Sequence, residues 1–161
     1  MKLSSGWEQS VYVLLILSRL PDGKSLNSSS LSERLGVSQS YLKKIIKSLV
    51  NEGLVRSTPG ISGGFSLAKP LNEITFYDVF LAVEGRGKIF ASQHLLKKFL
   101  GKEGDMAKNC AVTSSLDIIE DTLVSTLSDV TLEKVAADTS DSYELKDLDG
   151  WISQNAKGNR E

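Results

Sequence analysis

The clearest structural pattern in the chain lies in residues 28–67, SSSLSERLGVSQSYLKKIIKSLVNEGLVRSTPGISGGFSL. Its first part predicts a short helix, about Ser30–Leu35, because Asn27 and the serines that follow offer several N-caps and Gly36 provides a C-terminal stop. Ser38 is a good N-cap for a second helix, about Gln39–Glu52. The segment therefore predicts two helices separated by a tight turn.

The second of these helices has two chemically different faces. Its apolar residues, bordered by Tyr41, fall on one stripe: Leu42, Ile45, Ile46 and Leu49. The opposite face carries Ser40, Lys43, Lys44, Lys47 and Asn51. A helix of this kind packs its apolar stripe against a core and leaves its basic face in solvent. Gly53 ends the helix.

Two short β-strands are predicted next, Leu54–Ser57 and Phe65–Leu67, joined by the Pro- and Gly-rich loop Thr58–Gly64. A further helix, Phe76–Glu84, is predicted with Thr75 as its cap. At the start of the chain, Ser5 and Glu8 have capping-box spacing and predict a helix that continues to Leu20, where the sequence Pro-Asp-Gly ends it.

This order of elements predicts a mainly α fold with a small β-hairpin wing, the winged helix-turn-helix. A helix with a polar, basic outer face fits the major groove of DNA, and its N-terminal N–H groups favour phosphate. A glycine-rich hairpin loop can approach the DNA backbone closely. The alternative is a helix-turn-helix used for protein–protein contacts, in which the lysines only solvate a face.

The charge distribution permits a nucleic-acid partner. The 161-residue chain has a net charge of −1. Residues 1–84 carry nine Lys/Arg against seven Asp/Glu, whereas residues 85–161 carry ten against thirteen. Residues 39–69 hold five basic residues and one acid, and Arg56 of the first wing strand is one of the five. A basic face on a mildly acidic protein is compatible with DNA binding.

Composition excludes several classes of protein. The apolar fraction is 40% and the charged fraction 24%, which is typical of a globular domain. The longest apolar run, Val11–Leu17, is too short to span a bilayer and lacks the flanks of a signal peptide, so we expect a cytoplasmic protein with no membrane partner. One cysteine excludes an intramolecular disulfide and any multi-cysteine zinc or iron–sulfur site within one chain, so we expect no cofactor.

The sequence offers no catalytic or metal-binding set, and we expect no enzyme. His94 is the only histidine, so no second histidine can complete a metal site. The Gly60–Gly64 loop lacks the Lys-Ser/Thr of a phosphate-binding P-loop.

The second half of the chain is organised differently. A weakly amphipathic helix is predicted over Ile89–Leu100, a loop over Gly101–Asn109 and a longer helix over Thr113–Leu127. That longer helix carries an apolar stripe, Leu116, Ile119, Leu123 and Leu127, which is either core or the seam of a homodimer. We favour the seam, because little chain remains to cover a long helix within one subunit.

Thr131 is expected to cap a further helical turn, Leu132–Asp138. The tail from Thr139 is polar and acidic apart from a few apolar residues around Trp151. We expect it either to dock on the partner subunit or to be mobile. The chain therefore divides into 1–84, a winged helix-turn-helix DNA-binding domain; 85–138, a linker and sensor region with a dimerisation helix; and 139–161, an acidic C-terminal tail.

The segments Leu31–Leu49, Gly53–Ser57, Gly60–Ala68 and Ile74–Glu84 closely resemble the bacterial Rrf-two family, the regulators of the IscR, NsrR and CymR type. A looser similarity covers Asn109–Asp138. The resemblance implies a dimeric transcription regulator, usually a repressor, that binds double-stranded DNA at an inverted-repeat operator. It implies DNA contacts from the recognition helix and a wing shaped by glycines: Ser38, Gln39, Ser40, Lys43, Lys44 and Lys47, with Gly60, Gly63 and Gly64.

The chain departs from the family pattern at three places. Many members have Glu-Gln in place of Lys43-Lys44 and Arg in place of Pro59, so an operator sequence cannot be transferred. Cluster-binding members have three cysteines before the long helix, whereas this chain has only Cys110. It is similar in this respect to the YwnA-like subgroup, which has a lone cysteine there.

Cys110 has two interpretations. It is either an idle thiol that packs as a small apolar residue, or a thiol switch. Its place about one turn before a predicted helix start, with Lys108 nearby, would lower its pKa. A second route for a signal is a small molecule bound among aromatic residues, for which core packing is the competing interpretation: Trp7, Tyr12, Phe76, Tyr77, Phe80 and Phe90. A regulator with no effector, acting as an architectural or partner-binding protein, is the alternative function.

Overall fold

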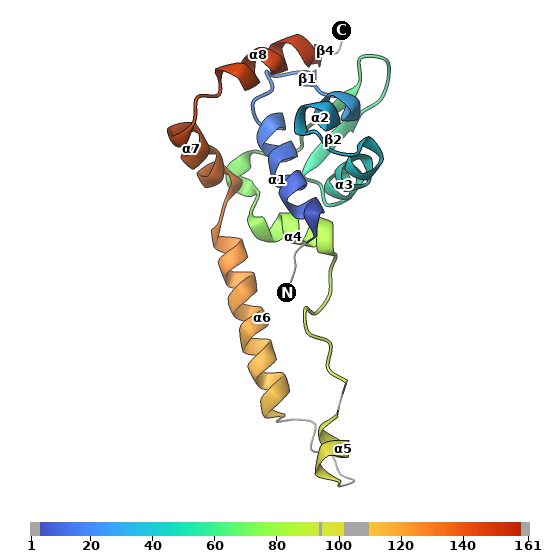
Figure 1. Ribbon diagram of the computed structural model, residues 1–161, viewed down its shortest axis with the longest axis vertical. Coiled ribbons are helices and arrows are strands. Elements are labelled where there is room, and N and C mark those ends of the chain that lie inside the picture. Colours follow the sequence, from blue (N-terminus) through green and yellow to red (C-terminus); the bar gives the residue numbers. More distant parts are fainter. Residues whose placement is uncertain (1–3, 94, 102–109, 159–161) are drawn as a thin grey trace. The chain divides into compact units, whose positions relative to one another are not determined.

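The computed structural model describes residues 4–93, 95–101 and 110–158 (Figure 1). By their internal contacts the residues form two compact units, Met1–Gly85 with Ser128–Glu161, and Arg86–Leu127. The predicted tail therefore groups by contact with the predicted DNA-binding segment. The division of the chain by function into three segments stays a prediction. Among the described residues, no helix is long and apolar enough to cross a membrane.

The first unit is built on four helices, α1 (Ser5–Leu17), α2 (Ser28–Leu35), α3 (Gln39–Asn51) and α4 (Phe76–Glu84). α1 packs against α3 and α4, and α2 packs against α3. The predicted apolar stripe of α3 is buried in this core: Leu42, Ile45, Ile46 and Leu49. The mainly α winged-helix fold that the sequence predicted is confirmed.

The wing is an antiparallel hairpin of β2 (Val55–Thr58) and β3 (Gly64–Leu67), with Arg56 paired to Ser66. Two strands that the sequence analysis did not predict accompany it. β1 (Lys24–Ser25) pairs with β4 (Lys157–Gly158), and the next residue, Leu26, forms an antiparallel bridge with Phe65 of β3. These short strands were missed because their pairing partners are distant in sequence.

Helix caps explain several boundaries. The Asn27 side chain accepts a hydrogen bond from the Ser30 N–H at 2.8 Å, and Gly36 ends α2 with φ of +64°. Thr75 and Asp78 form a reciprocal capping box at the start of α4. The capping box predicted for Ser5 and Glu8 is wrong.

The first helix starts after Ser4 instead. Ser4 makes no side-chain cap hydrogen bond, because its N–H and hydroxyl donate to the Glu84 carboxylate of α4 at 3.0 and 2.8 Å. The helix also ends at Leu17, three residues before the predicted Leu20.

The second unit contains α5 (Leu96–Leu100) and most of α6 (Ala111–Asp129). The helix predicted over Ile89–Leu100 is wrong in its first half. There, Lys88 forms an ion pair with Asp117 at 2.9 Å, and the Ile89 N–H donates to the Glu120 carboxylate. These contacts tie the start of the segment to α6.

The C-terminal segment forms two helices, α7 (Leu132–Ser142) and α8 (Lys146–Asn155). A short 3-10 turn, η1 (Leu71–Glu73), lies earlier in the chain, before α4. The structure packs the tail on its own chain rather than leaving it mobile, and docking on the partner subunit stays a prediction. Ile152 of α8 is 3% exposed and belongs to the core of the first unit. The tail therefore packs on the winged helix of its own chain.

Charged residues hold α8 in place beside the winged helix. Arg19 donates two hydrogen bonds to the Asp149 carboxylate, at 2.6 and 2.7 Å, and this pairing lowers the pKa of Asp149. Arg34, at the end of α2, pairs with Asp147 at 2.7 Å and lies over the Trp151 ring. The acidic residues of the tail thus neutralise two arginines of the helix-turn-helix.

Candidate nucleic-acid interface

The candidate interface starts from the outer face of α3. All six recognition-helix residues that the family resemblance singled out are exposed: Ser38, Gln39, Ser40, Lys43, Lys44 and Lys47. The burial of the opposite stripe forces this arrangement, because a helix that buries one face must present the other to solvent. The structure thus brings three lysines onto one accessible helix surface.

The N-terminal end of α3 leaves its backbone donors uncapped by Ser38. The Ser38 hydroxyl lies 3.1 Å from the Ser40 hydroxyl and makes no cap hydrogen bond. The first N–H groups of a helix lack intrahelical acceptors and carry a partial positive charge. The N–H groups at this end of the helix can therefore donate to a phosphate oxygen.

The wing loop depends on three glycines for two different reasons. Gly60 has a φ of +105°, which L side chains rarely adopt. A Cβ on Gly63 would lie 2.1 Å from the Thr58 carbonyl oxygen, and one on Gly64 would lie 2.6 Å from that of Leu26. These backbone approaches fold the loop tightly and fix where its tip stands.

Ile61 stands at that tip and was passed over in the sequence analysis. Its side chain is 97% exposed. An isolated isoleucine in a loop rich in Pro and Gly was the available signal, because nothing nearby in the sequence could bury it.

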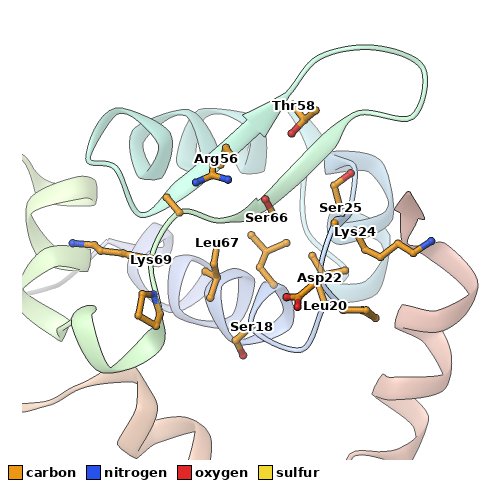
Figure 2. Close-up of a pocket in the computed structure, with 15 residues that line it drawn as sticks. Ser18, Leu20, Asp22, Lys24, Ser25, Arg56, Thr58, Ser66, Leu67 and Lys69 are labelled. Atoms are coloured by element: carbon orange, nitrogen blue, oxygen red, sulfur yellow. The ribbon is translucent and has the colours of Figure 1, made fainter. Parts of the chain in front are cut away.

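Arg56 is placed apart from the α3 lysines. It is exposed on β2 and lines a cavity of about 440 Å³ beside the turn that follows α1 (Figure 2). Within the predicted DNA-binding set, α3 and the wing loop carry most of the residues, and Arg56 belongs to the base of the wing.

Cys110 lies immediately before α6 and is half-buried. Hydrogen bonds from the Thr113 backbone and hydroxyl lower the pKa of its thiol, with a smaller contribution from the Val112 backbone. This matches the effect that the sequence analysis expected from a helix start. Lys108, the other expected influence, lies outside the described residues.

The apolar stripe of α6 is only partly covered by its own chain. α6 contains no buried residue; Leu116, Leu123 and Leu127 are half-buried, and Ile119 is 53% exposed. Ile118, beside the stripe, is 66% exposed. A long helix with this much apolar surface is typical of an interface.

The part of the chain that the structure describes contains no cluster of three or more His, Cys, Asp and Glu residues that could hold a metal ion. His94 lies outside the described residues. Two of the aromatic candidates, Trp7 and Phe76, pack edge to face at a centroid distance of 4.7 Å, and Tyr77 stacks with Phe80 at 6.4 Å. For Trp7 and Phe76, which pack against the core, the structure favours core packing.

A helix-turn-helix with a basic, exposed second helix and a glycine-shaped wing defines the class of winged-helix DNA-binding transcription regulators. The chain belongs to the Rrf2 family within that class. The model of this family, described as an iron-dependent transcriptional regulator, matches residues 3–138. Members of the family are transcription regulators and not enzymes.

Two relatives match almost the whole chain. A proposed HTH-type transcriptional regulator of Lactococcus lactis subsp. lactis (strain IL1403), YffB, is 65% identical over 154 residues, which cover 96% of this chain and 99% of YffB. A proposed HTH-type regulator of Bacillus subtilis (strain 168), YwgB, is 44% identical over 98% of this chain and 99% of its own length.

Solved structures share the fold. CymR (YrzC), the global cysteine regulator of B. subtilis, has a TM-score of 0.65 at 23% identity, with 86% of this chain and 98% of CymR covered. IscR of T. potens has the same TM-score and identity, with 89% and 92% covered.

The donor set of this chain does not fit the iron in the family's description. An iron–sulfur cluster is held by several cysteine thiolates, and this sequence contains one. We therefore derive no step through iron.

Proposed function

We propose that the protein is a homodimeric, sequence-specific transcription regulator that represses by binding an inverted-repeat operator. The observation that carries the proposal is the division of α3 into a buried apolar stripe and an exposed face with three lysines. In this proposal α3 enters the major groove, where lysine contacts guanine or phosphate. The wing loop, with Ile61 at its tip, approaches the adjacent backbone.

The dimer is proposed to form through α6. Its stripe of Leu116, Ile119, Leu123 and Leu127 stays partly exposed within the chain, and pairing two copies around a two-fold axis would remove it from water. Two recognition helices about 34 Å apart would then meet successive major-groove turns. The matching of the operator's symmetry to the protein's symmetry follows from this geometry.

Signal entry is proposed at Cys110. Its lowered pKa raises the fraction of reactive thiolate at neutral pH. CymR of Staphylococcus aureus, which shares the fold, has been solved in an oxidized form. A small-molecule effector is the second route, and a DNA-binding protein without any effector is the alternative. We also propose a cytoplasmic location, because the regulator acts on the chromosome.

Fluorescence anisotropy on DNA from the regulator's own upstream region, against a scrambled duplex, tests this function. Replacing Lys43, Lys44 and Lys47 with Gln is expected to lower affinity at least about 100-fold and to reduce the slope of log K against log salt by about 0.9 for each lost phosphate contact. A matched triple variant of exposed lysines elsewhere, Lys98, Lys134 and Lys146 to Gln, is expected to bind as the wild type does.

Retention of selective binding by the α3 variant would refute the assignment of the recognition helix. Repeating the titration after oxidation, with Cys110→Ala as control, tests the switch: affinity that falls in the wild type alone supports it. Equal affinity before and after oxidation removes Cys110 from the mechanism.

A further inference from the structure

A cavity lies at the base of the wing, and Arg56 is the residue of the predicted DNA-binding set that lines it. It has a volume of about 440 Å³ and lies between the end of α1, the turn Pro21–Gly23, β1 and the two wing strands (Figure 2). This volume is in the range of small-molecule sites, about 300–1,000 Å³. The space is therefore large enough for a small metabolite.

Three hydrogen-bond donors from the hairpin line this cavity. Arg56 and Thr58 are two residues apart on β2, and Ser66 pairs with Arg56 across the hairpin, so the three side chains share one face. None of the three side chains has a hydrogen-bond or ion-pair partner among the described residues. An arginine fork with two neighbouring hydroxyls is thus presented to the cavity without a protein acceptor.

The charge of the lining is positive. Lys24 and Lys69 stand at its two sides, with side chains directed outward (Figure 2), and Asp22 is the one carboxylate among the described lining residues. Lysine has a long, flexible stem that lets its ammonium group swing toward a bound anion. Three cations against one carboxylate leave the lining with a net positive charge, which attracts anions.

We propose that this cavity binds a small organic anion that carries a carboxylate or phosphate group. The guanidinium of Arg56 binds the anionic group in a bidentate manner, as its planar fork favours, and the hydroxyls of Thr58 and Ser66 donate further hydrogen bonds. Lys24 and Lys69 close over the ligand from the two sides.

The site is coupled to the wing through the hairpin itself. Arg56 and Ser66 belong to the two strands that the loop Thr58–Gly64 joins, so a ligand that fixes their spacing also fixes the loop. We infer that the bound anion is an effector that changes DNA affinity. This second step rests on the proposed DNA-binding function, whereas the binding site itself does not.

The site can be tested without DNA. Inorganic phosphate and citrate are titrated separately into the ¹⁵N-labelled full-length protein, with NaCl holding ionic strength constant. Saturable shifts of the Arg56 side-chain N–H and the Ser66 amide are expected with one or both probes. Arg56→Gln should weaken the apparent affinity at least tenfold, and Lys98→Gln, which removes an exposed cation on α5, should leave it unchanged. Non-saturating shifts, or equal affinity in both variants, overturn the site.

A second measurement separates a free anion from the DNA backbone, because both present phosphate oxygens. DNA affinity is measured at fixed ionic strength with and without the probe that saturates the site. We expect a change of at least threefold in the wild type and none in Arg56→Gln. Loss of DNA affinity and of one unit of salt slope in Arg56→Gln, without saturable anion binding, assigns Arg56 to the DNA backbone and overturns the proposal.

The two claims fail independently. Absence of selective DNA binding in every condition refutes the proposed function, while the titration with phosphate and citrate still decides the site. Saturable anion binding with unchanged DNA affinity refutes the effector role and leaves the site.

Discussion

Gly63 shows how a single atom can decide the form of the wing. Alanine there would place its Cβ 2.1 Å from the Thr58 carbonyl oxygen and 2.7 Å from the Pro59 carbonyl carbon, and both contacts are backbone. We expect Gly63→Ala to rearrange the loop, to lower the free energy of unfolding by about 1–3 kcal/mol and to weaken DNA binding. Chemical denaturation and anisotropy measure the two effects.

Gly150→Ala is the matched control for this prediction. Gly150 lies inside α8, and a Cβ there would meet open space. Alanine in a helix interior is expected to stabilise the protein by up to about 1 kcal/mol. Equal effects of the two substitutions would show that the close approach at Gly63 has no energetic weight.

Cys110 gives a prediction about pH. Because hydrogen bonds from Thr113 lower the pKa of the thiol in the folded protein, the thiolate persists to lower pH in the folded than in the unfolded chain. The rate of alkylation by iodoacetamide should therefore reach half its maximum at a lower pH in native protein than in urea. Thr113→Val should move the native midpoint upward, and coincident midpoints in native and unfolded protein would contradict the effect.

The sequence reached the right residue types in the wing but not their separate roles. Glycine in the Thr58–Gly64 loop was read as freedom to approach DNA, whereas Gly63 and Gly64 are required by approaches within the protein. Arg56 was grouped with the α3 lysines from its charge. Its place beside Asp22 and Lys24 depends on how the wing packs near the end of α1, which no local pattern encodes.

Among the helices, α8 is the one whose structural role the sequence missed. Its apolar residues contribute Ile152 to the core of the first unit, and its acids pair with Arg19 and Arg34. Ile152→Ala should therefore lower the free energy of unfolding of the winged helix by about 2–4 kcal/mol. Urea denaturation monitored by circular dichroism gives the value.

The same substitution at Ile61 is the control, because that side chain is 97% exposed. We expect a change within about 0.5 kcal/mol for Ile61→Ala. If Ile152→Ala were as mild, α8 would contribute little to the stability of the winged helix, and its docking would have no energetic consequence.

Elements with local signals were predicted well. α4 was predicted with the bounds it has, Phe76–Glu84, because its capping box is written within four residues. The helix that contains α5 was predicted to start too early, at Ile89. Weak amphipathicity is a local pattern and does not reveal that residues 88 and 89 bind Asp117 and Glu120 of α6. β1 and β4 could not be predicted, because 24–25 and 157–158 reveal their pairing only once the chain has folded.

At the scale of the whole molecule, the partly exposed stripe of α6 is the surface through which we propose that two chains pair, so that their two recognition helices bind one operator together. Leu123→Asp should convert a particle of twice the 17.5 kDa chain mass into one of a single chain mass, because a carboxylate in an apolar seam loses its hydration. Light scattering after size exclusion measures this, and operator affinity should fall with it.

Ser125→Asp, an exposed position of the same helix, is expected to leave both mass and operator affinity unchanged. A monomeric wild type would remove the proposed seam altogether. A Leu123→Asp protein that stays dimeric would instead place the interface elsewhere in the chain.

The pairing of Lys24–Ser25 with Lys157–Gly158 has a consequence for biosynthesis. Chains emerge from the ribosome N-terminal end first, so the nascent winged helix lacks β4 and the acids that pair with Arg19 and Arg34 until residues 147–158 have been synthesised. During that interval Arg19 and Arg34 are unpaired and the surface that Ile152 later covers is open. Contacts this distant in sequence also slow closure, because loop entropy is lost before the contacts form. A nascent chain that stops short of α8 therefore carries a winged helix whose Ile152-covered surface stays open.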